Sequence, residues 1–224
     1  MIKTKGLTKK FSRNEKEFYT LKDVSLHVGK GEFVGIAGHS GSGKTTFFNM
    51  IAGLTKPTSG KIYINDKEIT AMSENELAEC RNKEVGYILQ GSSLLNNFTV
   101  LDNVCMPAYL ASSYEKKREH ARKLLKEMGI EHLENEFPEF LSGGERKRVS
   151  IARAMLNEPL VILADEPTSN LDMENSKKVM ELLKQISEQG TTVLVSTHEL
   201  EWLKYTDYAM EMEDGVLKHY RSYL

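Results

Sequence analysis

The spacing of apolar residues changes several times along the chain, and each spacing predicts its own kind of element. Strict alternation, as in KIYIN at 61–65, predicts a strand with one exposed face, and a continuous apolar run, as in EFVGIA at 32–37, predicts a buried strand. On these grounds strands are expected at 20–28, 32–37, 61–65, 84–90, 160–165, 191–196, 208–213 and 216–220. Helices are expected between them, at 44–54, 73–82, 174–189 and 199–205.

The middle of the chain departs from this alternation of strands and helices. From 99 to about 155 the apolar spacing is helical, with Thr99 and Ser113 as suitable N-caps and Gly129 as a stop. The charged run KKREHARKLLKE in this stretch fits a solvated helix face better than a binding patch. The pattern therefore predicts a helical subdomain of about 91–155.

Length and charge narrow the class of protein. A chain of 224 residues can bury a substantial core, and we expect one α/β domain over 1–224 whose core comprises about 1–90 and 156–224. The formal net charge of −2 argues against general electrostatic binding to nucleic acid. No apolar run approaches the roughly 18–20 residues needed to cross a bilayer, so a role at a membrane requires a partner. Cys80 and Cys105 stand far apart, without metal-ligand spacing.

A glycine-rich segment follows the predicted buried strand at 32–37. Its sequence, GHSGSGKT, matches the phosphate-loop pattern G-x-x-x-x-G-K-[ST], and a predicted helix comes next. The glycines let backbone N–H groups point at phosphates, Lys44 adds positive charge, and the Thr45 hydroxyl is suited to ligate Mg²⁺. The residues expected to bind a nucleoside triphosphate here are Gly38, His39, Ser40, Gly41, Ser42, Gly43, Lys44, Thr45 and Thr46.

Two adjacent carboxylates end the apolar strand VILADE. Because side chains alternate along a strand, Asp165 and Glu166 point to different sides, so that one can associate with a metal and the other can activate water. His198 follows another strand, at the edge where open α/β sheets bind ligands. A lone histidine at a strand end is more often structural, but a neutral imidazole there could bond a γ-phosphate oxygen and the attacking water.

A second glycine-rich segment, LSGGE at 141–145, stands before a predicted helix. Ser142, Gly143 and Gly144 at a helix N-terminus form a second anion-binding site. One nucleotide does not need two such sites from one chain, whereas two chains facing head to tail would use both. The sequence therefore predicts a homodimer in which the LSGGE segment of each chain contacts the nucleotide bound by the other chain.

In their order and spacing these segments resemble the ATP-binding cassette (ABC) family, and the resemblance covers essentially the whole chain. The phosphate loop, LSGGE, ILADEP, SNLD at 169–172 and His198 carry it. The resemblance implies an α/β fold, a P-loop NTPase core with an N-terminal antiparallel β subdomain and an inserted α-helical subdomain. It also implies ATP and Mg²⁺ as cofactors, and hydrolysis of ATP.

The resemblance assigns roles to single residues. Gln90 matches the family's Q-loop glutamine, which reaches Mg²⁺ and the attacking water, and Phe11 stands where an aromatic side chain stacks on adenine, with Tyr19 as a weaker candidate. The implied catalytic residues are Lys44, Gln90, Glu166 and His198, and the implied metal ligands are Thr45, Gln90 and Asp165. The implied contacts to the partner's nucleotide come from Ser142, Gly143, Gly144 and Glu145, while Asp172 couples the two sites.

Two positions depart from the commonest family pattern. Glu145 stands where many relatives have glutamine, and the Ser-Gly-Gly phosphate contacts do not depend on it. Phe11 stands where tyrosine is common, so that stacking on adenine would lack a hydroxyl.

Within the family, the chain resembles the compact cassettes of macrolide exporters, lipoprotein-release systems, antimicrobial-peptide resistance pumps and a cell-division complex. The segments ENELAECRNKEVGYILQ and SLLNNFTVLDNV carry this likeness. It implies a cytoplasmic subunit, peripheral on the inner face of the cell membrane, that drives an integral-membrane permease through the surface between 90 and about 104.

Three other functions compete with a transport ATPase. A regulatory ATPase could control cell-wall hydrolases or a sensor kinase through a membrane partner without transport. A nucleic-acid machine of the same superfamily fits poorly with one uninterrupted cassette of near-neutral charge, so no nucleic-acid partner is expected. A small-molecule kinase would leave LSGGE unexplained.

Overall fold

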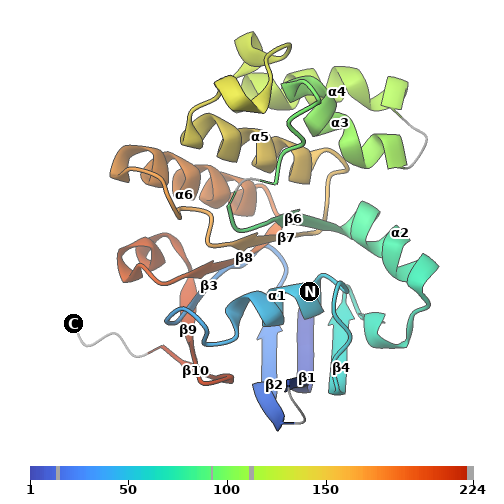
Figure 1. Ribbon diagram of the computed structural model, residues 1–224, viewed down its shortest axis with the longest axis vertical. Coiled ribbons are helices and arrows are strands. Elements are labelled where there is room, and N and C mark those ends of the chain that lie inside the picture. The colour runs from blue at the N-terminus through green and yellow to red at the C-terminus, as the bar shows by residue number, and fades with distance from the viewer. Residues whose placement is uncertain (14–15, 92, 111–113, 221–224) are drawn as a thin grey trace.

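The beginning of the chain forms an antiparallel sheet, drawn at the bottom of Figure 1. The computed structural model describes residues 1–13, 16–91, 93–110 and 114–220. The sheet has the order β2-β1-β4-β5, and its strands are β1 (Ile2–Arg13), β2 (Lys16–Val28), β4 (Ser59–Ile64) and β5 (Lys67–Glu68). Alternate side chains such as Ile2, Leu26 and Ile62 are buried, because one face of the sheet packs on the core. The predicted alternation at 61–65 is confirmed.

A mostly parallel sheet of six strands forms the centre of the molecule. Its order is β10-β9-β3-β8-β7-β6. The strands are β3 (Phe33–Ala37), β6 (Val85–Ile88), β7 (Val161–Asp165), β8 (Thr192–Thr197), β9 (Tyr208–Glu213) and β10 (Val216–His219). Every residue of β3, β7 and β8 is buried, as expected for parallel strands covered on both faces. Because β3, β6, β7 and β8 run parallel, their carboxyl ends meet at one edge of the sheet.

Helices cover both faces of this central sheet. Figure 1 shows α1 (Lys44–Ile51) on one side of it and α5 (Gly143–Met155) and α6 (Met173–Glu188) on the other. The remaining helices are α2 (Glu74–Glu84), α3 (Val100–Leu110) and α4 (Tyr114–Glu127), with 3-10 turns η1 (Ile69–Ala71), η2 (Glu131–Leu133), η3 (Pro138–Phe140) and η4 (Leu200–Tyr205). None of the helices in the described ranges is long and apolar enough to cross a bilayer.

Two hydrophobic cores lie on the two faces of the central sheet. One lies between that sheet, α1 and the antiparallel sheet, and includes Phe47 and Phe48. The other lies between the sheet and the helical layer of α3 to α6, and includes Val149 and Leu183. The sheet therefore separates α1 from α5, and this separation matters for the site.

The helical middle segment agrees with its predicted start and stop signals. Thr99 caps α3, because its hydroxyl accepts a hydrogen bond from the Asp102 N–H at 3.2 Å. Gly129 follows α4 with a φ of +66°, a left-handed conformation that favours glycine at a helix end. The other proposed cap, Ser113, lies outside the described residues. The predicted boundaries of the subdomain, 91 and 155, stay a prediction.

Candidate active site

The phosphate loop connects β3 to α1 and depends on glycine at two close approaches. A Cβ atom on Gly38 would lie 2.4 Å from the carbonyl oxygen of Met212, and one on Gly43, at a φ of +111°, would lie 2.6 Å from that of Thr20. Gly43 is also the N-cap of α1 and provides no side-chain cap. The first N–H groups of α1 therefore have no side-chain acceptor at their N-cap, as an anion-binding loop requires.

Lys44 lies buried across this loop, with a relative exposure of 4%. Its Nζ atom donates hydrogen bonds to the carbonyl oxygens of Gly38 at 2.8 Å and His39 at 3.1 Å. The Ser42 hydroxyl is buried and finds no hydrogen-bond partner among the described residues. Since an unsatisfied buried hydroxyl is costly, this atom fits a loop built to receive an oxyanion. Of the other predicted phosphate-loop residues, His39, Ser40, Gly41 and Thr45 are exposed, Gly43 is buried and Thr46 is half-buried.

The two carboxylates at the end of β7 point to different partners, in agreement with the predicted alternation. Asp165 is buried, and its Oδ1 atom accepts a hydrogen bond of 2.5 Å from the Ser196 hydroxyl. The same hydroxyl accepts a hydrogen bond of 2.9 Å from the backbone N–H of Glu166. Glu166 adopts a φ of +46°, a left-handed conformation that costs a non-glycine residue about 1–2 kcal/mol. Ser196 thus holds both residues of the pair.

Three side chains converge on the carboxylate of Glu166, one from the start of α1 and two from the segments that follow β6 and β8. Lys44 Nζ lies 3.3 Å from Oε1. Gln90 Nε2 donates a hydrogen bond of 2.9 Å to Oε2, and His198 Nδ1 lies 3.4 Å from the same oxygen. The four residues predicted to act in catalysis therefore lie together, although 46 positions separate Lys44 from Gln90 in the sequence. Gln90 and His198 are exposed, so the cluster is open to a ligand.

The second glycine-rich segment begins α5, on the other face of the sheet from α1 (Figure 1). Ser142 is the N-cap, and its N–H and hydroxyl both donate hydrogen bonds of 2.7 Å to Glu145 Oε2. These bonds hold the pKa of Glu145 below its ordinary value. Gly144 packs so tightly on Asn175 that a Cβ atom there would lie 2.4 Å from the Asn175 side-chain oxygen. Gly143 is half-buried, beside Leu171.

An exposed aromatic pair lies at the tip of the antiparallel sheet. Phe11 on β1 is paired in register with Phe18 on β2, and their ring centroids lie 6.0 Å apart in a stacked arrangement. Lys9 Nζ lies 5.0 Å from the Phe11 ring centroid. Tyr19 is exposed as well, and Lys10 Nζ lies 5.0 Å from its ring centroid. Phe11 therefore presents a ring to solvent with Phe18 behind it, an arrangement that can stack a planar base.

Sequence reasoning missed Ser196 and Phe18. Both are placed by pairing across a sheet, Ser196 opposite Asp165 and Phe18 opposite Phe11. A hydroxyl inside the apolar run TTVLVST was the only sequence signal for Ser196. Together, a buried lysine in a glycine loop and an acidic strand end that faces it define the site of a P-loop nucleoside triphosphatase.

Comparison with known proteins supports the assignment to this class of nucleoside triphosphatase. The ABC transporter family profile matches residues 21–169. The chain is 41% identical over 214 residues, 95% of this chain and 93% of the relative, to the lipoprotein-releasing system ATP-binding protein LolD of Buchnera aphidicola subsp. Schizaphis graminum. It is 42% identical over 218 residues, 96% of each chain, to the uncharacterized ABC transporter ATP-binding protein MJ1508 of Methanocaldococcus jannaschii.

A solved structure extends the agreement to three dimensions. The dimeric structure of a post-hydrolysis state of the ATP-binding cassette MJ0796, bound to ADP and Pi, matches with a TM-score of 0.90 at 38% identity, over 100% of both chains. The chain belongs to the ABC transporter family, and it is an ATP-binding and ATP-hydrolysing subunit of an ABC transporter. The predicted family, fold class and enzyme class are confirmed.

Proposed function

We propose that two copies of this chain close head to tail on ATP, and that closing and opening drive an integral-membrane permease. The support is the position of the two anion-binding ends, which begin helices on opposite faces of one sheet. A nucleotide in the phosphate loop therefore needs the Ser142 end of a second copy. The matching MJ0796 cassette is itself described as a dimer.

The residues around the phosphate loop fit ATP with Mg²⁺. The buried, unpaired Ser42 hydroxyl and the buried Lys44 suit the triphosphate, and Thr45, Gln90 and Asp165 supply the oxygen donors that Mg²⁺ prefers. When bound, Mg²⁺ would neutralise charge on the phosphate oxygens. Lys44, now held by two carbonyl oxygens and near Glu166, would turn toward the β- and γ-phosphates. Phe11 would stack on the adenine ring.

The convergence on Glu166 is the observation that carries the catalytic assignment. Its carboxylate is nearly buried and in contact with an amide and an imidazole, so it can take a proton from a water that these groups hold in line. Gln90 and His198 orient the water, and Lys44 stabilises charge on the transferred phosphoryl group. The γ-phosphate would be contacted from the other side by the second copy, through its Ser142, Gly143 and Gly144.

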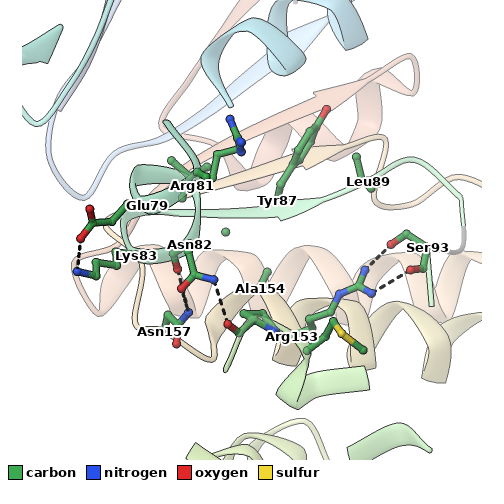
Figure 2. A pocket seen from close by; sticks show the side chains of 15 residues that line it. Glu79, Arg81, Asn82, Lys83, Tyr87, Leu89, Ser93, Arg153, Ala154 and Asn157 are labelled. Carbon is green, nitrogen blue, oxygen red and sulfur yellow. Dashed lines mark hydrogen bonds and ion pairs between the residues drawn. The ribbon is translucent and has the colours of Figure 1, made fainter. Parts of the chain in front are cut away.

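A pocket beside the site suits the permease. It has a volume of about 770 Å³ and lies between α2 and β6 on one side and the ends of α3 and α5 on the other (Figure 2). Arg81, Lys83 and Arg153 line it against one acidic side chain, Glu79. Because cations outnumber acidic side chains in its lining, we assign it to a permease segment that carries an acidic residue. Leu89 also lines the pocket, so the occupant would lie next to Gln90.

The class of cargo follows from relatives. The 41% identical LolD is named for lipoprotein release. We therefore propose export or force transmission at the inner face of the cell membrane, with the subunit peripheral on its permease.

A catalytically blocked variant tests the proposed cycle. Glu166→Gln removes the base but keeps the contacts of the site, so ATP hydrolysis should fall at least ~100-fold while ATP binding persists. On size-exclusion chromatography the variant should then run as a dimer with ATP and Mg²⁺ and as a monomer with ADP. A chain that stays monomeric with saturating ATP would contradict the closed dimer. Glu188→Gln, the same chemical change at an exposed residue of α6 outside the cluster, is the matched control.

A further inference from the structure

Two cations on α5, the buried Lys147 and the half-buried Arg153, hold the backbone that follows Gln90. Lys147, with a relative exposure of 4%, donates a hydrogen bond of 3.3 Å from Nζ to the carbonyl oxygen of Gly91. Arg153, further along the same helix, donates to the carbonyl oxygen of Ser93 at 2.9 Å and to its hydroxyl at 2.5 Å (Figure 2). One helix thus grips the chain at Gly91 and Ser93, directly after the glutamine that contacts Glu166.

The surroundings of both side chains disfavour their charged forms. Desolvation lowers the pKa of Lys147, which nearby Asp165 offsets only in part, and it also lowers the pKa of Arg153. No ion pair within 4 Å relieves either cation among the described residues. At the buried position of Lys147, an apolar side chain of similar length would fill the same space at a smaller desolvation penalty. Packing alone therefore does not account for the charge of Lys147.

We propose that Lys147 and Arg153 are positioning residues that make Gln90 move together with the Ser142 end of α5. The proposal rests on the head-to-tail dimer described above. α5 is a continuous helix of 13 residues, about 20 Å long, so a shift at Ser142 is passed to Lys147 little more than one turn away. Contact of Ser142 with the partner's γ-phosphate then sets the Gln90 contact to Glu166 in the chain's own site.

The hydrogen bonds between Arg153 and Ser93 also lie next to the pocket that we assign to the permease. Ser93 and Arg153 both line that pocket, and their hydrogen bonds lie at its edge in Figure 2. An occupant of the pocket therefore touches the segment that Lys147 and Arg153 hold. In this arrangement α5 receives the partner's nucleotide at its beginning and the permease near its end, and both act on Gln90.

Lys147→Met tests the proposal, because it keeps the length and burial of the side chain and removes the donor. We expect kcat for ATP to fall about 10-fold with KM changed less than about 3-fold, and the Hill coefficient for ATP to fall toward 1. Thermal stability should stay level or rise, since a buried charge is removed. Lys123→Met, on the exposed face of α4, is the control and should behave as wild type.

Ser93→Ala provides a second, milder variant, which removes only the hydroxyl partner of Arg153 and should lower kcat about 3-fold. Wild-type kcat and Hill coefficient in both variants would overturn the proposal, and so would a loss that only follows lost thermal stability.

Hydrogen exchange separates this proposal from the dimer itself. In a Glu166→Gln background, ATP should slow amide exchange in peptides 141–146 and 85–91 together. With Lys147→Met added, protection of 141–146 should remain and that of 85–91 should be lost. If both peptides stay protected, the coupling through Lys147 is wrong. If ATP gives no dimer and protects neither peptide in the Glu166→Gln parent, the proposed function itself fails.

Discussion

At the scale of single residues, Glu166 combines an unfavourable backbone conformation with a nearly buried charge. The residue adopts a left-handed φ, and its carboxylate lies nearly buried beside one amide, one imidazole and one ammonium group. Such a conformation persists only where its surroundings hold it, and Ser196 does so through the Glu166 N–H. A rigid carboxylate at a strand end suits a base that must meet one water in one direction.

The adenine contact gives a prediction at this scale. Phe11→Ala should raise the Kd for ATP about 10-fold, because stacking of one base on an aromatic ring contributes ~1–3 kcal/mol. Phe18→Ala should have a smaller effect in the same direction, since Phe18 only supports the ring. Tyr19→Ala serves as the control. Isothermal titration of the Glu166→Gln background with ATP measures all three, and a loss of affinity in Tyr19→Ala alone would move the adenine site to that residue.

At the scale of elements, α2 and α5 begin in the same way but face different tasks. Both carry a capping box, Ser73 with Glu76 and Ser142 with Glu145, with hydrogen bonds of nearly equal length. The capping-box pattern S-x-x-E is present in the sequence of both segments, although the sequence analysis interpreted 141–145 only as an anion site. The carboxylate of Glu145 thus already accepts hydrogen bonds from the Ser142 donors that are proposed to meet the partner's phosphate.

The two capping boxes predict a dependence of stability on pH. Hydrogen bonds from Ser73 and Ser142 hold the pKa of Glu76 and Glu145 below the ordinary value of 4.5. Their stabilisation is complete above that value and is lost as pH falls toward the lowered pKa of the folded state, because the unfolded chain takes up protons first. Unfolding temperatures measured between roughly pH 5 and pH 3 should therefore fall.

Glu76→Gln keeps an acceptor for the cap but does not titrate, so the fall in unfolding temperature should be smaller in this variant. Glu188→Gln, an exposed change at the end of α6, should follow wild type. Equal slopes for wild type and Glu76→Gln would contradict the assigned role of the box.

Local elements were the part of the fold that the sequence predicted best. Alternation, apolar runs and caps identified the strands and helices because these signals act between neighbours in the chain. β1 at Ile2–Arg13 was not placed as a strand of its own, since its polar, lysine-rich sequence lacks a strong alternation, and pairing with β2 and β4 forms it. The pocket that we assign to the permease was not predicted, because it arises from packing between α2, β6 and α5.

At the scale of the whole molecule, one central sheet positions the catalytic residues and also keeps α5 away from the phosphate loop of the same chain. The parallel strands bring Gln90, Glu166 and His198 to one edge, which the predicted order of elements already implied. The same sheet keeps α1 and α5 on opposite faces (Figure 1). In the proposed dimer, the phosphate loop and the Ser142 segment of one chain would therefore contact two different nucleotides.

Mixing two inactive variants tests this account most directly. Lys44→Ala should abolish ATP binding in the phosphate loop, and Ser142→Asp keeps a good N-cap for α5 while it repels the partner's γ-phosphate. Each variant alone should be inactive. In a head-to-tail pair, the phosphate loop of the Ser142→Asp chain meets the intact LSGGE segment of the Lys44→Ala chain, so one complete site forms.

We predict that an equal mixture recovers measurable ATPase activity of at most about a quarter of wild type, the ceiling that random pairing sets with one working site in each mixed dimer. Coupling through Lys147 lowers the recovered activity below that ceiling, because the working chain carries Ser142→Asp and its partner binds no ATP. A mixture as inactive as its two components would contradict the shared site.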